Sequence, residues 1–261
     1  MFNTIKKKIL NTQVKETPFP YIFINDLIDE KKLKNLNKVL PNYKDIVGDN
    51  ILYQSSSRSK KTILPKSKIY KKLEKNKSFS EIDKTFRKLK PTIIKKFEKY
   101  IQMHVSKNFS HKSLKYHSSY SVMRKGYKKS PHLDRRDHLI HMIFYPFSNS
   151  AEGGEICIHK LKKQKKVYDV FPNYRELKIN EKYKVKNNSC IIILNVPWAY
   201  HSVSLYKSEI DRKYFYMVYD FPIIKSGSKL KNRKEGFNQN YFWKDEVKVK
   251  SSKRKNVFLS E

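Results

Sequence analysis

The chain has 261 residues, of which 38% are hydrophobic and 13% aromatic; this is enough for a sizeable core and excludes a wholly disordered protein. Lysine and arginine number 58 against 24 acidic residues, a formal net charge of +34. No window of eighteen residues is apolar enough for a transmembrane helix, residues 1–10 lack the apolar stretch of a secretory signal, and two cysteines make no disulfide framework, so we expect a reducing cytoplasm.

One domain with two basic extensions is the predicted organisation. Residues 1–16 form a basic N-terminal extension, and residues 17–225 form the domain. Residues 226–261 form a C-terminal tail with ten basic and four acidic residues. No internal repeat is visible.

The first part of the domain reads as helical. A short apolar run over 21–24 predicts a strand, and a helix capped by Asn25 or Asp26 follows it to about residue 40. Residues 43–79 are polar and predict loops with short strands. A long helix is expected from a cap at Ser80 to about Val105, kinked at Pro91, because apolar residues recur at helical spacing. The stripe consists of Phe86, Leu89, Ile93, Phe97 and Ile101.

From residue 118 onward the pattern changes to short strands. A basic stretch over 160–176 interrupts them, and the Asn187–Asn188–Ser189 run predicts a turn. Helices followed by many strands indicate an α+β domain built on a β-sandwich or barrel. The expected strands are 120–123, 139–147, 155–159, 177–185, 190–195, 201–205 and 213–221.

Four residues of the strand-rich half form a pattern typical of metal chemistry. His132 and Asp134 are two apart on an extended segment, so their side chains point the same way. His201 on a distant strand completes two histidines and one carboxylate, the facial ligand set of non-haem Fe(II) oxygenases, which leaves metal positions open. Arg212 opens the last strong strand, where it points into the same barrel and can grip a carboxylate through two hydrogen bonds.

These residues resemble the Fe(II)/2-oxoglutarate-dependent dioxygenases, in the prolyl-4-hydroxylase-like branch. The family pattern is His-x-Asp, a distal His, and Arg or Lys about ten residues later. The segment PFPYIFINDLI at 18–28, the GGE at 153–155 and the stretch from Leu194 to Val203 also resemble family motifs. The resemblance covers about 17–224 and implies a double-stranded β-helix (jelly-roll) core, about 118–224, with the N-terminal helices packed on one sheet.

The resemblance also implies roles for individual residues. His132, Asp134 and His201 would bind Fe(II), with 2-oxoglutarate and O₂ as co-substrates. Arg212 would bind the distal carboxylate of 2-oxoglutarate. Tyr145 lies where the family often places a tyrosine hydroxyl on that carboxylate, and Tyr216 shares the strand face of Arg212. The implied activity couples oxidative decarboxylation of 2-oxoglutarate to hydroxylation of a C–H bond.

Several residues near this pattern have two interpretations. A register slip of one residue would put Lys213 in place of Arg212. His141 shares a strand face with Tyr145, which favours a pocket position, whereas the spacing of His138 favours surface or core. A third histidine also allows zinc, although a zinc hydrolase needs neither Arg212 nor the glycine turn.

Other residues read as either structural or functional. Arg124, near Tyr120, is either a substrate contact or a surface residue. Arg135 and Arg136, beside Asp134, either recruit an anionic substrate or are solvated. Cys157 and Cys190 are expected to be small buried apolar residues.

The charge leaves the partner open. Only nine of the 58 basic residues are arginine, whereas base-edge and phosphate recognition favour arginine, so coding bias in an A+T-rich genome is one explanation. The alternative function is a basic polyanion-binding protein, for nucleic acid or an anionic glycan, on a non-catalytic β-helix. Nucleic acid is not favoured as a substrate. A protein or peptide residue is the first choice and an anionic saccharide the second.

Overall fold

The structure is a computed structural model, and it describes residues 1–48, 51–53, 58–105, 110–135, 137–148, 153–163, 165, 167–221 and 248–250. Most of the predicted tail and Arg136 lie outside the described residues. None of the helices in the described ranges is long and apolar enough to cross a membrane.

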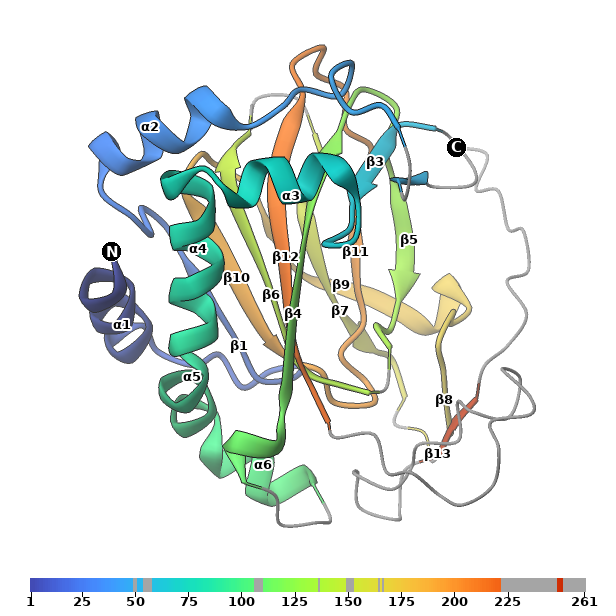
Figure 1. Ribbon diagram of the computed structural model, residues 1–261. Coiled ribbons are helices and arrows are strands. Elements are labelled where there is room, and N and C mark those ends of the chain that lie inside the picture. Colours follow the sequence, from blue (N-terminus) through green and yellow to red (C-terminus); the bar gives the residue numbers. More distant parts are fainter. Residues whose placement is uncertain are drawn as a thin grey trace, which may run out of the picture.

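The α-helices of the described chain lie in its first 104 residues (Figure 1). These helices are α1 (Phe2–Asn11), α2 (Glu30–Val39), α3 (Lys68–Glu74), α4 (Lys77–Lys88), α5 (Lys90–Lys96) and α6 (Glu98–His104). The side chains that cap α2, α3 and α4 are Asp29, Ser67 and Asn76, and each accepts a hydrogen bond from a backbone N–H of the first turn.

The strands form two antiparallel sheets that face each other. The larger has the order β1-β10-β6-β12-β4-β3-β2, and the smaller β5-β11-β7-β9. The bounds are β1 (Tyr21–Ile24), β2 (Ile51–Tyr53), β3 (Lys60–Ile63), β4 (Lys115–Met123), β5 (Lys129–His132), β6 (His138–Phe147), β7 (Ile156–Leu161), β9 (Leu177–Tyr183), β10 (Ser189–Leu194), β11 (His201–Val203) and β12 (Arg212–Asp220). A further pair joins β8 (Val167–Asp169) to β13 (Lys248–Lys250) in parallel.

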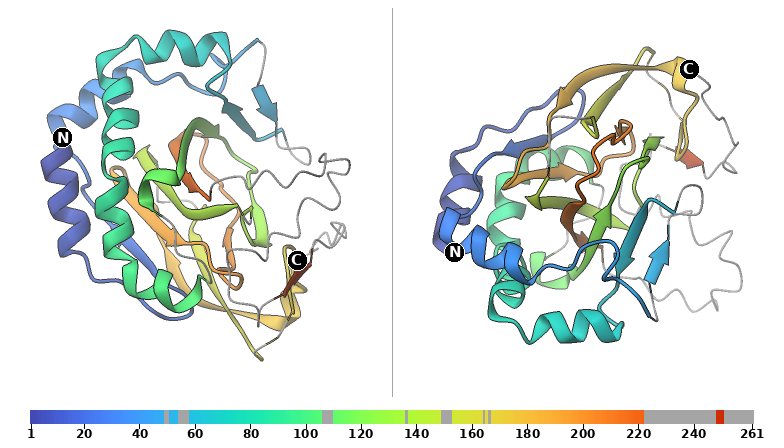
Figure 2. Two further views of the ribbon diagram at one scale, coloured as in Figure 1. Left: turned by 60° about the horizontal axis from the view of Figure 1, so that its bottom comes forward. Right: turned by 90° about the horizontal axis from the view of Figure 1, so that it is seen from above.

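The helices cover one face of the larger sheet, and the smaller sheet covers the other (Figures 1 and 2). Phe79 of α4 packs on Tyr120 and Phe215, and the Tyr219 hydroxyl donates to the carbonyl of Phe86. Residues of β12 with the opposite parity, such as Tyr216, face the smaller sheet and reach Asp134. The predicted double-stranded β-helix with helices on one sheet is therefore confirmed.

The expected long helix is wrong in detail. Three helices replace it, with breaks at Leu89 and Phe97, and Pro91 lies in the first turn of α5, where its missing N–H costs no hydrogen bond. The stripe residues are nonetheless buried. Asn76, not Ser80, caps α4, and Asp29, not Asn25 or Asp26, caps α2.

Several elements were not expected from the sequence, among them β8 in the basic stretch and β13 in the tail. Residues 68–74, predicted as loop, form α3 because Ser67 caps them and Tyr70 is buried. Residues 129–132 form β5. Part of the N-terminal extension forms α1, with Ile5 and Ile9 fully buried in the core.

Candidate metal centre

The two predicted metal-binding histidines lie opposite each other on the smaller sheet. β5 and β11 are antiparallel, and His132 pairs directly with His201, so their rings stand 4.4 Å apart between centroids. Asp134 follows β5 by two residues. Its Oδ1 is 3.3 Å from His132 Nε2, and its Oδ2 is 3.8 Å from His201 Nε2. Two adjacent octahedral ligands at about 2.1 Å from one ion would stand about 3.0 Å apart, so small shifts suffice to bind an ion here.

Backbone carbonyls fix both imidazoles in the tautomer that a metal needs. His132 Nδ1 donates to the carbonyl of Ser130 and His201 Nδ1 to that of Ala199, each at 3.0 Å. The lone pair of each ring is therefore on Nε2, which faces Asp134. Burial and, to a lesser extent, the nearby Lys129 charge lower the pKa of His132 to about 3, so the ring is neutral at physiological pH. Burial also lowers the pKa of His201.

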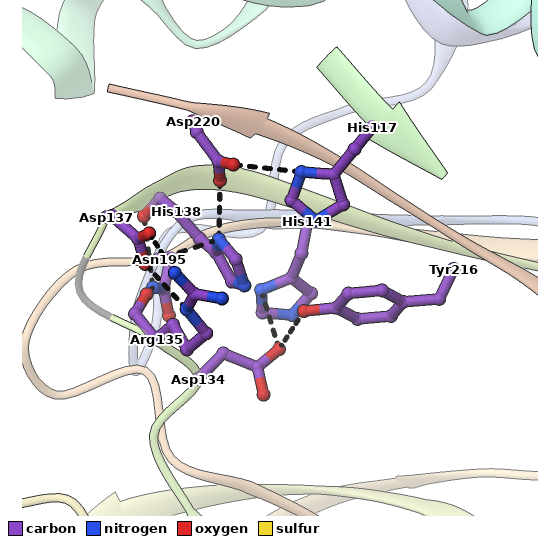
Figure 3. A network of polar contacts seen from close by, with 9 residues as sticks. All are labelled: His117, Asp134, Arg135, Asp137, His138, His141, Asn195, Tyr216 and Asp220. Atoms are coloured by element: carbon purple, nitrogen blue, oxygen red, sulfur yellow. Dashed lines mark hydrogen bonds and ion pairs between the residues drawn. The ribbon is translucent and has the colours of Figure 1, made fainter. Parts of the chain in front are cut away.

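The Asp134 carboxylate has further neighbours on the larger sheet (Figure 3). The Tyr216 hydroxyl donates to Oδ2 at 2.8 Å, and His141 Nδ1 lies 3.2 Å from the same oxygen. Burial by itself raises the pKa of this carboxyl, but His141, His132 and His201 outweigh it and hold the pKa well below its usual value. Asp134 is thus an anion, positioned by four side chains.

His141 is the main addition that the structure makes to the predicted ligand set. Its side chain is fully buried, and neither ring nitrogen makes a hydrogen bond to a described residue, although Nδ1 is at ion-pair distance from Asp134. Its ring lies 5.0 Å from that of His201 and stacks on that of Tyr216. The alternation of side chains along the strand predicted that His141 faces inward, on the same side as Tyr145. That it lies next to Asp134 could not be predicted, because this contact depends on the tertiary fold.

Arg212 is fully buried and faces the space between the sheets. Its Nε donates to Ser148 Oγ at 2.7 Å, Nη1 donates to the Gly154 carbonyl, and Nη2 donates to the Gly153 carbonyl at 3.3 Å. Its guanidinium also stacks 4.4 Å from the Tyr206 ring centroid. Among the described residues, these contacts use three of the five N–H donors of Arg212, and the other two can bind a carboxylate.

The glycine turn is part of this arginine site. Gly154 has φ +71°, and a Cβ built on it would stand 2.6 Å from Arg212 Nη1 and 2.7 Å from Tyr206 Cδ2. Only glycine allows the backbone to approach the guanidinium this closely. The motif was recognisable in the sequence by family resemblance alone, and this close approach is its physical reason.

The remaining cofactor-pocket candidates are also placed. Tyr145 is buried, with its ring 5.9 Å from the guanidinium of Arg212. Tyr216 lies between the sheets as its parity predicted, but the hydrogen bond of its hydroxyl is to Asp134. Lys213 points to the opposite side, where Nζ donates to the carbonyl of Leu40 at 2.8 Å. In this register Arg212, not Lys213, faces the pocket.

The structure also gives the contacts of the other residues that had two interpretations. The Arg124 guanidinium stacks on the Tyr43 ring at 4.4 Å, and the Tyr120 hydroxyl donates to the Pro41 carbonyl. Arg135 is exposed and forms an ion pair with Asp137. Both cysteines are free and buried, as expected.

His138 is buried against Asp220, with 2.5 Å between Nδ1 and Oδ1. Its odd spacing from His141 would put the two rings on opposite faces of a regular strand. A register shift pairs His138 with Asp220 but Ile140 with Tyr219, so one extra residue of β6 is accommodated. This bulge turns His138 to the face that carries His141.

Sequence reasoning missed Ser148 and Tyr206, the side chains that hold Arg212, because neither belongs to a motif and both come from segments outside β12.

Comparison with known proteins supports the fold. No protein-family model and no curated protein matches the chain. Among solved structures, a prolyl-4-hydroxylase from Pseudomonas putida is 9% identical, with a TM-score of 0.52 over 85% of this chain and 99% of that one. A viral collagen prolyl hydroxylase from Paramecium bursaria Chlorella virus-1, solved with 2-oxoglutarate, is 11% identical over 77% of this chain and 95% of that one, with a TM-score of 0.45. A Streptomyces hygroscopicus protein with nickel and 2-oxoglutarate bound is 9% identical over 83% of this chain and 89% of that one, with a TM-score of 0.45. The Pseudomonas putida structure, with a TM-score above 0.5, confirms the expected fold of the prolyl-4-hydroxylase-like branch.

Proposed function

We propose that this protein is an Fe(II)/2-oxoglutarate-dependent dioxygenase. The observation that carries the proposal is the triad itself: two buried imidazoles, each with Nδ1 donating to a carbonyl, direct their Nε2 lone pairs toward one carboxylate whose side chain is only 12% exposed. Two histidines and one carboxylate with open positions are the donor set of non-haem Fe(II) oxygenases. A polyanion-binding protein without turnover gives no reason to bury such a set.

His132, Asp134 and His201 would hold the metal. Fe(II) with 2-oxoglutarate and O₂ supplies the oxidative decarboxylation that drives hydroxylation of a C–H bond. The protein's part is to position these groups and exclude water. Tyr216 holds Asp134 in place, and the two carbonyl-bound Nδ1 groups hold the rings.

The pocket between the sheets favours a dicarboxylate. Arg212 offers two N–H donors at its buried end, and Tyr145 lies beside it. At the metal end, the charge of Lys129 contributes to the low pKa of His132. The charge of the buried Arg212, together with that of Lys129 near His132, favours an anion with two carboxylates.

For the substrate we propose a protein or peptide residue, with an anionic saccharide as the alternative. For the compartment we propose the cytoplasm, which the two free, buried cysteines support. The substrate class is tested by measuring succinate formation with peptide mixtures and with anionic glycans.

The deciding experiment is an anaerobic titration of the metal-free protein with Fe(II) and 2-oxoglutarate. We expect a weak visible metal-to-ligand charge-transfer band in the wild type and no band in His201→Ala. His111→Ala, outside the triad, is the matched control and keeps the band. A folded wild type without a band would refute the proposal.

A further inference from the structure

A second group of metal-binding side chains lies near the triad, and the proposed oxygenase chemistry makes no use of it. His117 of β4, His138 of β6 and Asp220 of β12 meet on one face of the larger sheet (Figure 3). Their ligand atoms all lie within 4.8 Å of one another. The three strands are neighbours, and the β6 bulge brings His138 to the same face as the other two.

The geometry directs one nitrogen of each ring at one carboxylate. His138 Nδ1 is 2.5 Å from Asp220 Oδ1, and His117 Nδ1 is 2.9 Å from Oδ2. Asp137 Oδ1 stands 3.7 Å from His138 Nδ1, at the edge of the group, and both Asp137 oxygens accept from Arg135. Tetrahedral ligands at about 2.1 Å from one ion stand about 3.4 Å apart. The two His–Asp contacts of 2.5 and 2.9 Å would therefore lengthen by up to about 1 Å, in a group whose ligand atoms all lie within 4.8 Å of one another.

The charged-group partners of Asp220 are imidazoles. Lys115 is directly opposite Asp220 in the β4–β12 register, and the sequence is rich in lysine, yet both carboxylate oxygens contact imidazoles. His138 and Asp220 are largely buried, whereas the His117 side chain is 43% exposed. The group is therefore fixed on the inside and accessible from solvent through His117, as a site that exchanges an ion requires.

We propose that His117, His138 and Asp220 form a second metal site, for a divalent transition ion of the zinc class. Imidazole nitrogens with carboxylates suit zinc, cobalt and nickel better than calcium or magnesium. An ion here would tie together β4, β6 and β12 and fix His138. Asp134 and His138 are only four residues apart in the chain. The first metal would bind Asp134, and the second ion would bind His138.

The test uses Co(II), whose visible ligand-field bands report its coordination, together with metal content after dialysis. The His132→Ala/His201→Ala protein lacks the first site, and we expect it to retain one equivalent of Co(II). Adding His117→Ala should abolish this binding, while adding His111→Ala as the matched control should not. If the double variant binds no Co(II) while folded, or binds it equally well after His117→Ala, the second site is refuted.

A second measurement applies if the double variant fails to fold. Wild-type protein should lose one equivalent of Co(II) on His117→Ala alone, a change at a half-exposed side chain that is tolerable for the fold. Equal Co(II) content in these two proteins would refute the site. The charge-transfer band with Fe(II) and 2-oxoglutarate reports the first site separately, so failure of the oxygenase proposal and failure of this one give different results.

Discussion

Gly154→Ala tests whether the glycine turn exists to admit Arg212. The alanine Cβ would stand 2.6 Å from Arg212 Nη1, against about 3.5 Å for ordinary contact, so the guanidinium must move by roughly 1 Å. The φ of +71° adds strain of about 1–2 kcal/mol, and overpacking adds about 1–3 kcal/mol. We expect a loss of about 2–5 kcal/mol in the free energy of unfolding.

Gly126→Ala is the matched control. Gly126 also has a positive φ, +87°, but a Cβ at this position would have nothing within 4 Å, so the variant reports backbone strain alone, about 1–2 kcal/mol. Urea unfolding of the two variants therefore separates strain from the clash with Arg212.

The functional arm is the titration with Fe(II) and 2-oxoglutarate. If Arg212 binds the distal carboxylate as proposed, displacing its guanidinium in Gly154→Ala should weaken 2-oxoglutarate binding by about tenfold or more, equivalent to about 1.4 kcal/mol, and leave Fe(II) binding unchanged. If Gly154→Ala is no less stable than Gly126→Ala and binds 2-oxoglutarate normally, the assignment of Gly154 and Arg212 is refuted.

Three further predictions concern the metal carboxylate, a buried histidine and a turn. Tyr216→Phe removes the hydroxyl that donates to Asp134 and should weaken Fe(II) binding by about tenfold or more without unfolding the protein. A metal titration that gives the variant the same Fe(II) affinity as the wild type would contradict this. Burial lowers the pKa of His159 to about 4, so the unfolded chain takes up a proton below about pH 6.5 that the folded chain refuses, and stability falls as pH drops from 6.5 to 4. Over pH 6 to 5, His159→Gln should reduce the slope of unfolding free energy by up to about 1.4 kcal/mol per pH unit, and an unchanged slope argues against a neutral buried ring. The Asn188 side chain accepts from the Ile28 N–H and donates to the Ile28 carbonyl, so Asn188→Ala should lower the free energy of unfolding in urea by about 2–4 kcal/mol. Asn188→Gly should lower it by less, because glycine tolerates the φ of +63° at this position. Equal losses in the two variants would show that backbone strain is unimportant here.

The sequence by itself determined the strand-rich half, the two-layer architecture and the candidate triad. Strand side chains alternate, so apolar runs and the His132–Asp134 spacing reveal which side chains share a face. The helical stripe likewise identified buried residues such as Ile93, although not where the helices break. Each of these inferences uses a period that is local in the chain.

Only the tertiary structure decided the features that depend on pairing between distant segments. The β6 bulge reversed the face of His138, and the β12 register directed Arg212 inward and Lys213 outward. Tyr216 and His141 converge on Asp134 because two sheets pack face to face. Register, bulges and sheet packing are set by contacts between residues far apart in sequence, and a local period does not encode them.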